Sequence, residues 1–158
     1  MEYEIYTDGA CSKNPGPGGY AFIILVNKKE WLRVKGHKAH ATNNEMELTA
    51  IVKAIQHTLI HPNGFSKNTT GEQKITIYSD SAYCLNAINQ KWINSWALNG
   101  WKNKEGKEIK NKGLWQKTWH FLNLKNVEYE FIKVKGHSGN EFNELVDVLA
   151  KSAVKKEI

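Results

Sequence analysis

Three stretches with β-strand patterns follow one another at the start of the chain, joined only by short links. Residues 1–8 alternate in polarity, and residues 20–26 and 31–38 also have strand patterns. The Gly- and Pro-rich residues 9–19 are expected to turn, and so are residues 27–29. Three consecutive strands with such links predict an antiparallel meander. Any sheet that this chain builds has to include that meander.

Helix and strand patterns alternate along the rest of the chain. The predicted elements are a helix over 44–60, a polar loop over 62–73, a strand over 75–79, a helix over 82–89, a short helix and an irregular loop after it, a helix over 114–122, a strand over 127–134, and a final helix after a flexible link at 136–139. With no internal repeat and no linker, the 158 residues predict one mixed α/β domain.

The composition excludes several classes of protein. Hydrophobic residues make up 41% of the chain and charged residues 24%, which argues against disorder. No apolar run approaches the roughly 18 residues that cross a bilayer, and the N-terminus lacks a secretory pattern. Two cysteines are too few for disulfides to stabilise a fold of this size. We therefore expect a cytoplasmic protein with no membrane association, no obligate protein partner and a monomeric state.

The positive charge of the chain is concentrated in one segment. The net charge is +6, and residues 91–117 hold seven lysines against two glutamates, which gives this segment +5. The segment also contains four of the six tryptophans. Lysines neutralise phosphates and aromatic faces pack on sugars or bases, so the combination favours a nucleic-acid partner. A lysine-rich stretch is also typical of a solvated surface, and composition alone does not decide.

Four carboxylates occupy positions where strands end or where helices meet a sheet. Asp8 and Asp80 end two predicted strands, at the edge where open α/β sheets bind ligands. Glu47 and Asp147 flank the apolar stripes of the first and last long helices. If the four converged they would repel one another unless a cation neutralised them, and their oxygens suit Mg²⁺ or Mn²⁺. Each also has an ordinary use as a cap, a helix-dipole partner or a surface residue, and spacing alone does not show that they meet.

Five short motifs carry a family resemblance. They are residues 6–11 (YTDGAC), 14–20 (NPGPGGY), 42–48 (TNNEMEL), 79–81 (SDS), and 134–137 (VKGH) with Asp147 ten residues later. In this order they make the chain resemble the type I ribonucleases H, in particular bacterial-type members with a basic handle region. The resemblance implies a mixed five-stranded sheet, a three-strand antiparallel meander plus parallel strands, flanked by helices. It also implies a single catalytic domain over 1–158, with the handle within about 91–117.

The resemblance further implies an activity and a cofactor. The family's enzymes are endonucleases that hydrolyse the RNA strand of RNA–DNA hybrids and leave 5′-phosphate and 3′-hydroxyl ends. Asp8, Glu47, Asp80 and Asp147 match the catalytic, metal-binding carboxylates. The implied cofactor is Mg²⁺, two ions per site in the substrate complex, with Mn²⁺ as an alternative. His137 matches a mobile histidine that assists proton transfer and product release without binding metal.

Contacts to the hybrid follow from the same match. Asn14, Asn43 and Asn44 match groove-contacting positions, where an amide can bind the 2′-hydroxyl of RNA. Cys11 matches a position near the backbone, and Thr42 a phosphate-pocket residue. Asparagine and threonine also form turns and caps everywhere, and both uses can hold together.

The handle completes the expected interface. Trp92 and Trp96 match positions that line a channel for the DNA strand, and lysines of the segment, including Lys102 and Lys104, support it. Trp115 and Trp119 lie at helical spacing and are expected in the core. The chain departs from some relatives in having Ala82 where they carry glutamine, and in a longer 62–73 loop with no assigned role.

Two other functions compete with a hybrid-specific nuclease. A resolvase or a proofreading-type exonuclease on the same fold shares acidic strand ends but lacks the Asn-Asn-x-Met-Glu-Leu element joined to a Trp-rich handle. A non-catalytic module that binds hybrid or duplex RNA would keep the handle and the asparagines. Such a module would have no reason to keep four carboxylates and a glycine-flanked histidine.

Overall fold

A computed structural model describes residues 2–61, 73–134 and 140–154. The strands are β1 (Glu2–Cys11), β2 (Gly16–Val26), β3 (Lys29–Ala41), β4 (Gln73–Ser79) and β5 (Val127–Lys133). The helices are α1 (Asn43–Leu59), α2 (Ala82–Asn89), α3 (Trp92–Leu98), α4 (Lys112–Leu122) and α5 (Glu141–Ala153). No helix in these ranges is both long enough and apolar enough to cross a membrane.

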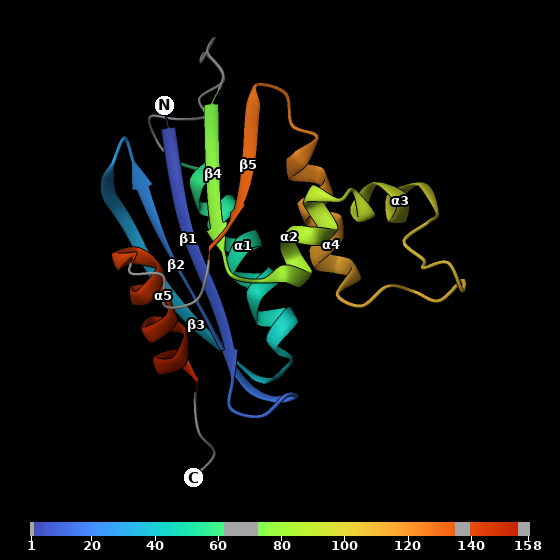
Figure 1. The fold of residues 1–158 in the computed structure, drawn as a ribbon, viewed down its shortest axis with the longest axis horizontal. Coiled ribbons are helices and arrows are strands. Elements are labelled where there is room, and N and C mark those ends of the chain that lie inside the picture. The colour runs from blue at the N-terminus through green and yellow to red at the C-terminus, as the bar shows by residue number, and fades with distance from the viewer. Residues whose placement is uncertain (1, 62–72, 135–139, 155–158) are drawn as a thin grey trace.

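The strands form one mixed sheet in the order β3-β2-β1-β4-β5 (Figure 1). Neighbours pair antiparallel from β1 to β2 and from β2 to β3, which confirms the meander. The pairs β1–β4 and β4–β5 are parallel. The central strand, β1, therefore belongs to both halves of the sheet, as the family resemblance predicts.

Helices cover both faces of the sheet. Alternation along β1 sends Tyr3 and Ile5 into the larger core beneath α1, and sends Tyr6 into a smaller core with Val146 of α5. Figure 1 shows α5 on one face and α1 on the other, with α3 and the loop after it projecting beyond α2 and α4. Trp115 is fully buried and Trp119 packs against the same core, which confirms the core prediction for both.

The predicted end of the first strand at Asp8 is wrong. β1 continues to Cys11, and Gly9 pairs with Tyr20 of β2, which itself begins at Gly16. Only the parallel pairing with β4 stops early, at Tyr6. A glycine after a strand pattern indicates a turn, but Gly9 instead makes room for a helix: a Cβ on Gly9 would lie 2.4 Å from the backbone nitrogen of Glu47. Asp8 therefore lies within β1, beyond the last residue of β1 that pairs with β4.

A second glycine sets the position of α5. A Cβ added to Gly19 would lie 2.4 Å from the carbonyl oxygen of Ala150 and 2.9 Å from the nitrogen of Val154, so α5 would have to move. We expect Gly19→Ala to lower the free energy of unfolding by about 1–3 kcal/mol, measured by urea denaturation.

Gly113 provides the matched control, because nothing lies within 4 Å of its Cβ position in α4. Gly113→Ala should leave stability unchanged or raise it by up to about 1 kcal/mol. Equal stability of Gly19→Ala and the unmodified protein would contradict this account of how α5 packs.

Candidate active site

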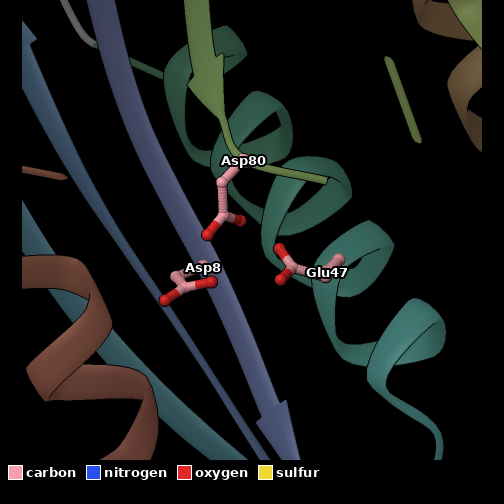
Figure 2. A group of neighbouring side chains, drawn as sticks. All are labelled: Asp8, Glu47 and Asp80. Carbon is pink, nitrogen blue, oxygen red and sulfur yellow. The ribbon is translucent and has the colours of Figure 1, made fainter. Parts of the chain in front are cut away.

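Three carboxylates from three elements meet at the edge of the sheet. Asp8 lies on β1, Asp80 directly follows β4 and Glu47 lies on α1. One oxygen of each lies within 4.8 Å of the others. Figure 2 shows the three side chains converging on the same space between the strands and α1. The parallel pairing of β1 with β4 therefore brings Asp8 and Asp80 together, and Glu47 joins them.

The backbone explains why the three side chains meet. The register of β1 on β4 pairs Tyr6 with Tyr78, which carries the chain to Asp8 and Asp80 at the same level of the sheet. Gly9 allows the backbone of α1 to approach β1 at Glu47. The backbone N–H of Gly9 also donates to Oδ1 of Asp8 at 2.9 Å, which fixes that carboxylate.

Burial makes this cluster electrostatically costly. Asp8 is only 5% exposed, and burial, followed by the nearby charge of Asp80, raises its pKa to about 7. Burial and the charges of Asp8 and Asp80 raise the pKa of Glu47 well above its ordinary value. Burial also raises the pKa of Asp80. Charged carboxylates therefore repel one another here in a poorly solvated space.

The donor set fits a divalent metal ion. Oε2 of Glu47 is buried and has no hydrogen-bond partner among the residues that the structure describes. Buried carboxylate oxygens need a partner, and hard cations such as Mg²⁺ and Mn²⁺ prefer oxygen ligands. Because a cation would supply the missing partner and offset the repulsion, the three residues can hold such an ion.

Asp147 lies at the same cleft, outside the group of three. Its Oδ2 accepts from Nζ of Lys151 at 3.0 Å, and its side chain is about one-third exposed. Its proximity also contributes to the raised pKa of Asp8. The cleft has a volume of about 510 Å³. Its lining residues are Asp8, Gly9, Ala10, Cys11, Asn43, Asn44, Glu47, Asp80, Ser81, Ala82, Tyr83, Asp147 and Lys151.

Of the other predicted contacts, three line this cleft, namely Cys11, Asn43 and Asn44. Two others have structural partners: Oγ1 of Thr42 accepts from the N–H of Glu45 and caps α1, and Oδ1 of Asn14 accepts from the N–H of Asn43, both at 3.1 Å. His137 lies outside the described residues, and so does most of the 62–73 loop.

A second cleft, of about 440 Å³, adjoins the first. Its lining residues are Asn14, Thr42, Asn44, Glu45, Tyr83, Lys110 and Asn111. Asn44 and Tyr83 line both clefts, so the two clefts are neighbours on the surface. Asn14 and Thr42, which the acidic cleft does not include, are brought together with Asn44 here.

Sequence reasoning missed several residues of these clefts. The hydroxyl oxygen of Tyr83 accepts from Nε1 of Trp115 at 2.9 Å and from Nδ2 of Asn111 at 3.2 Å. These bonds link α2 to the start of α4, and no local pattern pairs residues so far apart. Lys151 was also missed, although its i,i+4 spacing from Asp147 on a predicted helix could have revealed it.

The handle forms a third cleft, of about 390 Å³. Its lining residues are Trp92, Ser95, Trp96, Asn99, Lys102, Asn103 and Lys104. Trp92 is 42% exposed, whereas Trp96 packs edge-to-face on buried Trp115 at 5.4 Å between ring centroids. The structure therefore brings the two predicted tryptophans and the two predicted lysines to one hollow surface.

The raised pKa of Asp8 predicts how metal-free stability depends on pH. Between about pH 4 and pH 7 the folded protein keeps a proton on Asp8 that the unfolded chain releases, so the free energy of unfolding falls as pH rises through this range. We expect a loss of about 1–3 kcal/mol between pH 5 and pH 8 in EDTA, measured by urea denaturation. Asp8→Asn should show a smaller loss, since its amide does not titrate. Parallel pH profiles for the two proteins would contradict this prediction.

Comparison with known proteins gives matches over nearly the whole chain. The family model described as RNase H matches residues 1–155. A Ribonuclease H from Caldicellulosiruptor saccharolyticus is 46% identical over 155 residues, which cover 98% of this chain and 97% of that protein. A Ribonuclease H from Syntrophomonas wolfei is 41% identical over 154 residues, with coverage of 98% and 97%.

Solved structures share the fold. The crystal structure of LC9-RNase H1, described as a type 1 RNase H with the type 2 active-site motif, matches with a TM-score of 0.71 and 27% identity, covering 97% of this chain and 72% of that one. LC11-RNase H1 in complex with RNA/DNA hybrid matches with a TM-score of 0.66 and 22% identity, with coverage of 96% and 98%. The motifs, the mixed sheet and these full-length relatives lead to one conclusion: this chain belongs to the ribonuclease H family.

Proposed function

We propose that this protein hydrolyses the RNA strand of RNA–DNA hybrids and leaves 5′-phosphate and 3′-hydroxyl ends. The observation that carries the proposal is the convergence of Asp8, Glu47 and Asp80 within 4.8 Å in a cleft that also presents Asn43 and Asn44. Relatives 39–46% identical are named Ribonuclease H, and one structure with this fold was solved in complex with RNA/DNA hybrid.

The proposed cofactor is Mg²⁺, two ions per site when the hybrid is bound, with Mn²⁺ as an alternative. Asp8, Glu47 and Asp80 would hold the ions, together with Asp147 at the edge of the same cleft. Bound ions in such a site lower the pKa of an attacking water and stabilise the leaving oxygen. Support comes from the raised pKa of Asp8 and from the unpartnered buried oxygen of Glu47. We assign proton transfer and product release to His137, on the family match alone.

The groove next to the carboxylates is proposed to read the RNA strand. Asn43 and Asn44 lie at the N-terminus of α1, directly beside the acidic cleft. An amide can both donate to and accept from a 2′-hydroxyl, which DNA lacks. Asn14 and Cys11 extend this polar surface, and Ala82 lines the cleft with a methyl group that offers no such contact.

The second cleft and the handle are proposed to hold the DNA strand. Thr42, Lys110 and Asn111 line one cleft and suit a phosphate, since they offer a hydroxyl, an ammonium and an amide. Trp92 and Trp96 offer aromatic surface for sugars or bases, and Lys102 and Lys104 offer charge for phosphates. We propose that the protein acts as a cytoplasmic monomer and that residues 1–158 form one catalytic domain.

Removal of one charge from the carboxylate cluster tests the catalytic assignment. Asp8→Asn should abolish cleavage of a labelled hybrid at ordinary Mg²⁺, because a neutral amide is a poorer metal ligand. Hybrid binding, followed by fluorescence anisotropy, should persist because phosphate and groove contacts lie elsewhere. Glu130→Gln removes an exposed carboxylate on β5 and should cleave normally. Full activity of Asp8→Asn would contradict the assignment.

The handle should act on affinity and not on the chemical step. Its proposed phosphate contacts are tested by converting four lysines to alanine together, namely Lys102, Lys104, Lys107 and Lys110. We expect KM to rise while kcat at saturating hybrid stays nearly unchanged. The slope of log K against log salt should flatten by up to about four units, about one for each lost contact.

The matched control converts four other lysines to alanine, at the end of the sheet that lies away from Asp8 and Asp80. These are Lys28, Lys29, Lys74 and Lys125. This variant has the same change in net charge as the handle variant. Its slope of log K against log salt should stay closer to that of the unmodified protein than the slope of the handle variant does. Equal slopes and affinities for the handle variant and the unmodified protein would mean that the handle is only a solvated surface.

A further inference from the structure

One cationic side chain lines the acidic cleft. Lys151 lies in the last turn of α5, one turn after Asp147, and its Nζ is 3.0 Å from Oδ2 of that carboxylate. Among the described residues that line the cleft, Lys151 is the single lysine or arginine. It therefore places a positive charge at the cleft that the proposed metal ions would occupy.

A carboxylate other than its direct partner also affects the ammonium group of Lys151. Its pKa is raised first by the hydrogen bond and charge of Asp147, and also by the charge of Asp8. Asp147 and Asp8 line the same cleft. Lys151 is therefore paired with a carboxylate that shares the cleft with Asp8, the most buried aspartate of the cluster.

An ammonium and a divalent cation cannot easily share one carboxylate. Nζ of Lys151 already binds Oδ2 of Asp147, and a divalent cation on the same carboxylate would lie within a few ångströms of this ammonium and be repelled by it. The side chain of Lys151 is 64% exposed and that of Asp147 about one-third exposed, so water weakens this repulsion but does not remove it at a few ångströms. Binding of either cation to the carboxylate of Asp147 therefore weakens binding of the other.

We propose that Lys151 is a positioning residue that holds Asp147 in the metal-free protein and competes with a divalent cation for this carboxylate. Metal binding then requires Asp147 to exchange its ammonium partner for the ion. Without substrate, the cleft binds metal less tightly than its four carboxylates would on their own. This inference rests on the proposed metal site and names a residue that lowers the affinity of that site for metal ions.

An ordinary structural role would give a different result. Lysine four residues after aspartate, in the last turn of a helix, stabilises the helix through the ion pair and the helix dipole. Loss of that role would lower the thermal stability of the protein and leave its metal affinity unchanged. Metal affinity is therefore the measurement that separates the two.

The test is a calorimetric titration of metal-free protein with Mn²⁺ alone. Lys151→Gln should bind Mn²⁺ more tightly, on the order of fivefold, because repulsion and competition are both removed. Lys151→Arg keeps the charge and should remain near the unmodified protein. Lys28→Gln removes an equal charge, together with the ion pair to Glu4 at the other end of the sheet, and should not change affinity.

The Asp147→Asn background identifies the carboxylate through which Lys151 acts. In that background Lys151→Gln should tighten Mn²⁺ binding by less than about twofold, since the shared ligand has been removed. Equal affinity of Lys151→Gln and the unmodified protein would overturn the proposal, and so would an undiminished gain in the Asp147→Asn background. If no variant binds Mn²⁺, the proposed metal site itself fails, and this inference fails with it.

Discussion

Mutual repulsion among Asp8, Glu47 and Asp80 opposes folding of the metal-free chain, and the surrounding structure has to withstand it. Their oxygens lie within 4.8 Å of one another, and Asp8 is almost fully buried. Burial removes the water that would otherwise screen these charges, so the charge of Asp80 raises the pKa of Asp8, and the charges of both aspartates raise the pKa of Glu47. A bound divalent cation would offset this repulsion, because all three carboxylates would then be attracted to one positive charge.

The sheet and the first helix supply the rigidity that this arrangement needs. Asp8 lies on β1, which is hydrogen-bonded on one side to β2 and on the other to β4. Glu47 lies between Met46 and Leu48 of α1, both of which are buried, so the helix cannot easily turn the carboxylate away. Gly9 permits the close contact between this helix and β1. The same contacts that form the core therefore fix the three carboxylates.

Much of this could be predicted from sequence because the relevant patterns are local. Alternation and apolar spacing predicted the meander and the helices. The family resemblance implied a site of four carboxylates, and the structure brings three of them together, Asp8, Glu47 and Asp80, with Asp147 lining the same cleft outside this group. The end of β1 was predicted wrongly, because Gly9 has the same signature in a turn as under a packed helix. The bonds from Trp115 and Asn111 to Tyr83 could not be predicted, since they join segments about 30 residues apart that only the fold brings together. The roles of His137 and of the substrate contacts stay predictions.

Cleavage of defined nucleic acids tests the central claim most directly. The substrates are an end-labelled RNA–DNA hybrid, duplex DNA, duplex RNA and both single strands, each incubated with Mg²⁺ and with EDTA. The account predicts cuts only in the RNA strand of the hybrid, only with Mg²⁺, and with 3′-hydroxyl ends that a polymerase can extend. Cleavage that persists in EDTA, or duplex RNA or DNA cut as readily as the hybrid, would contradict it.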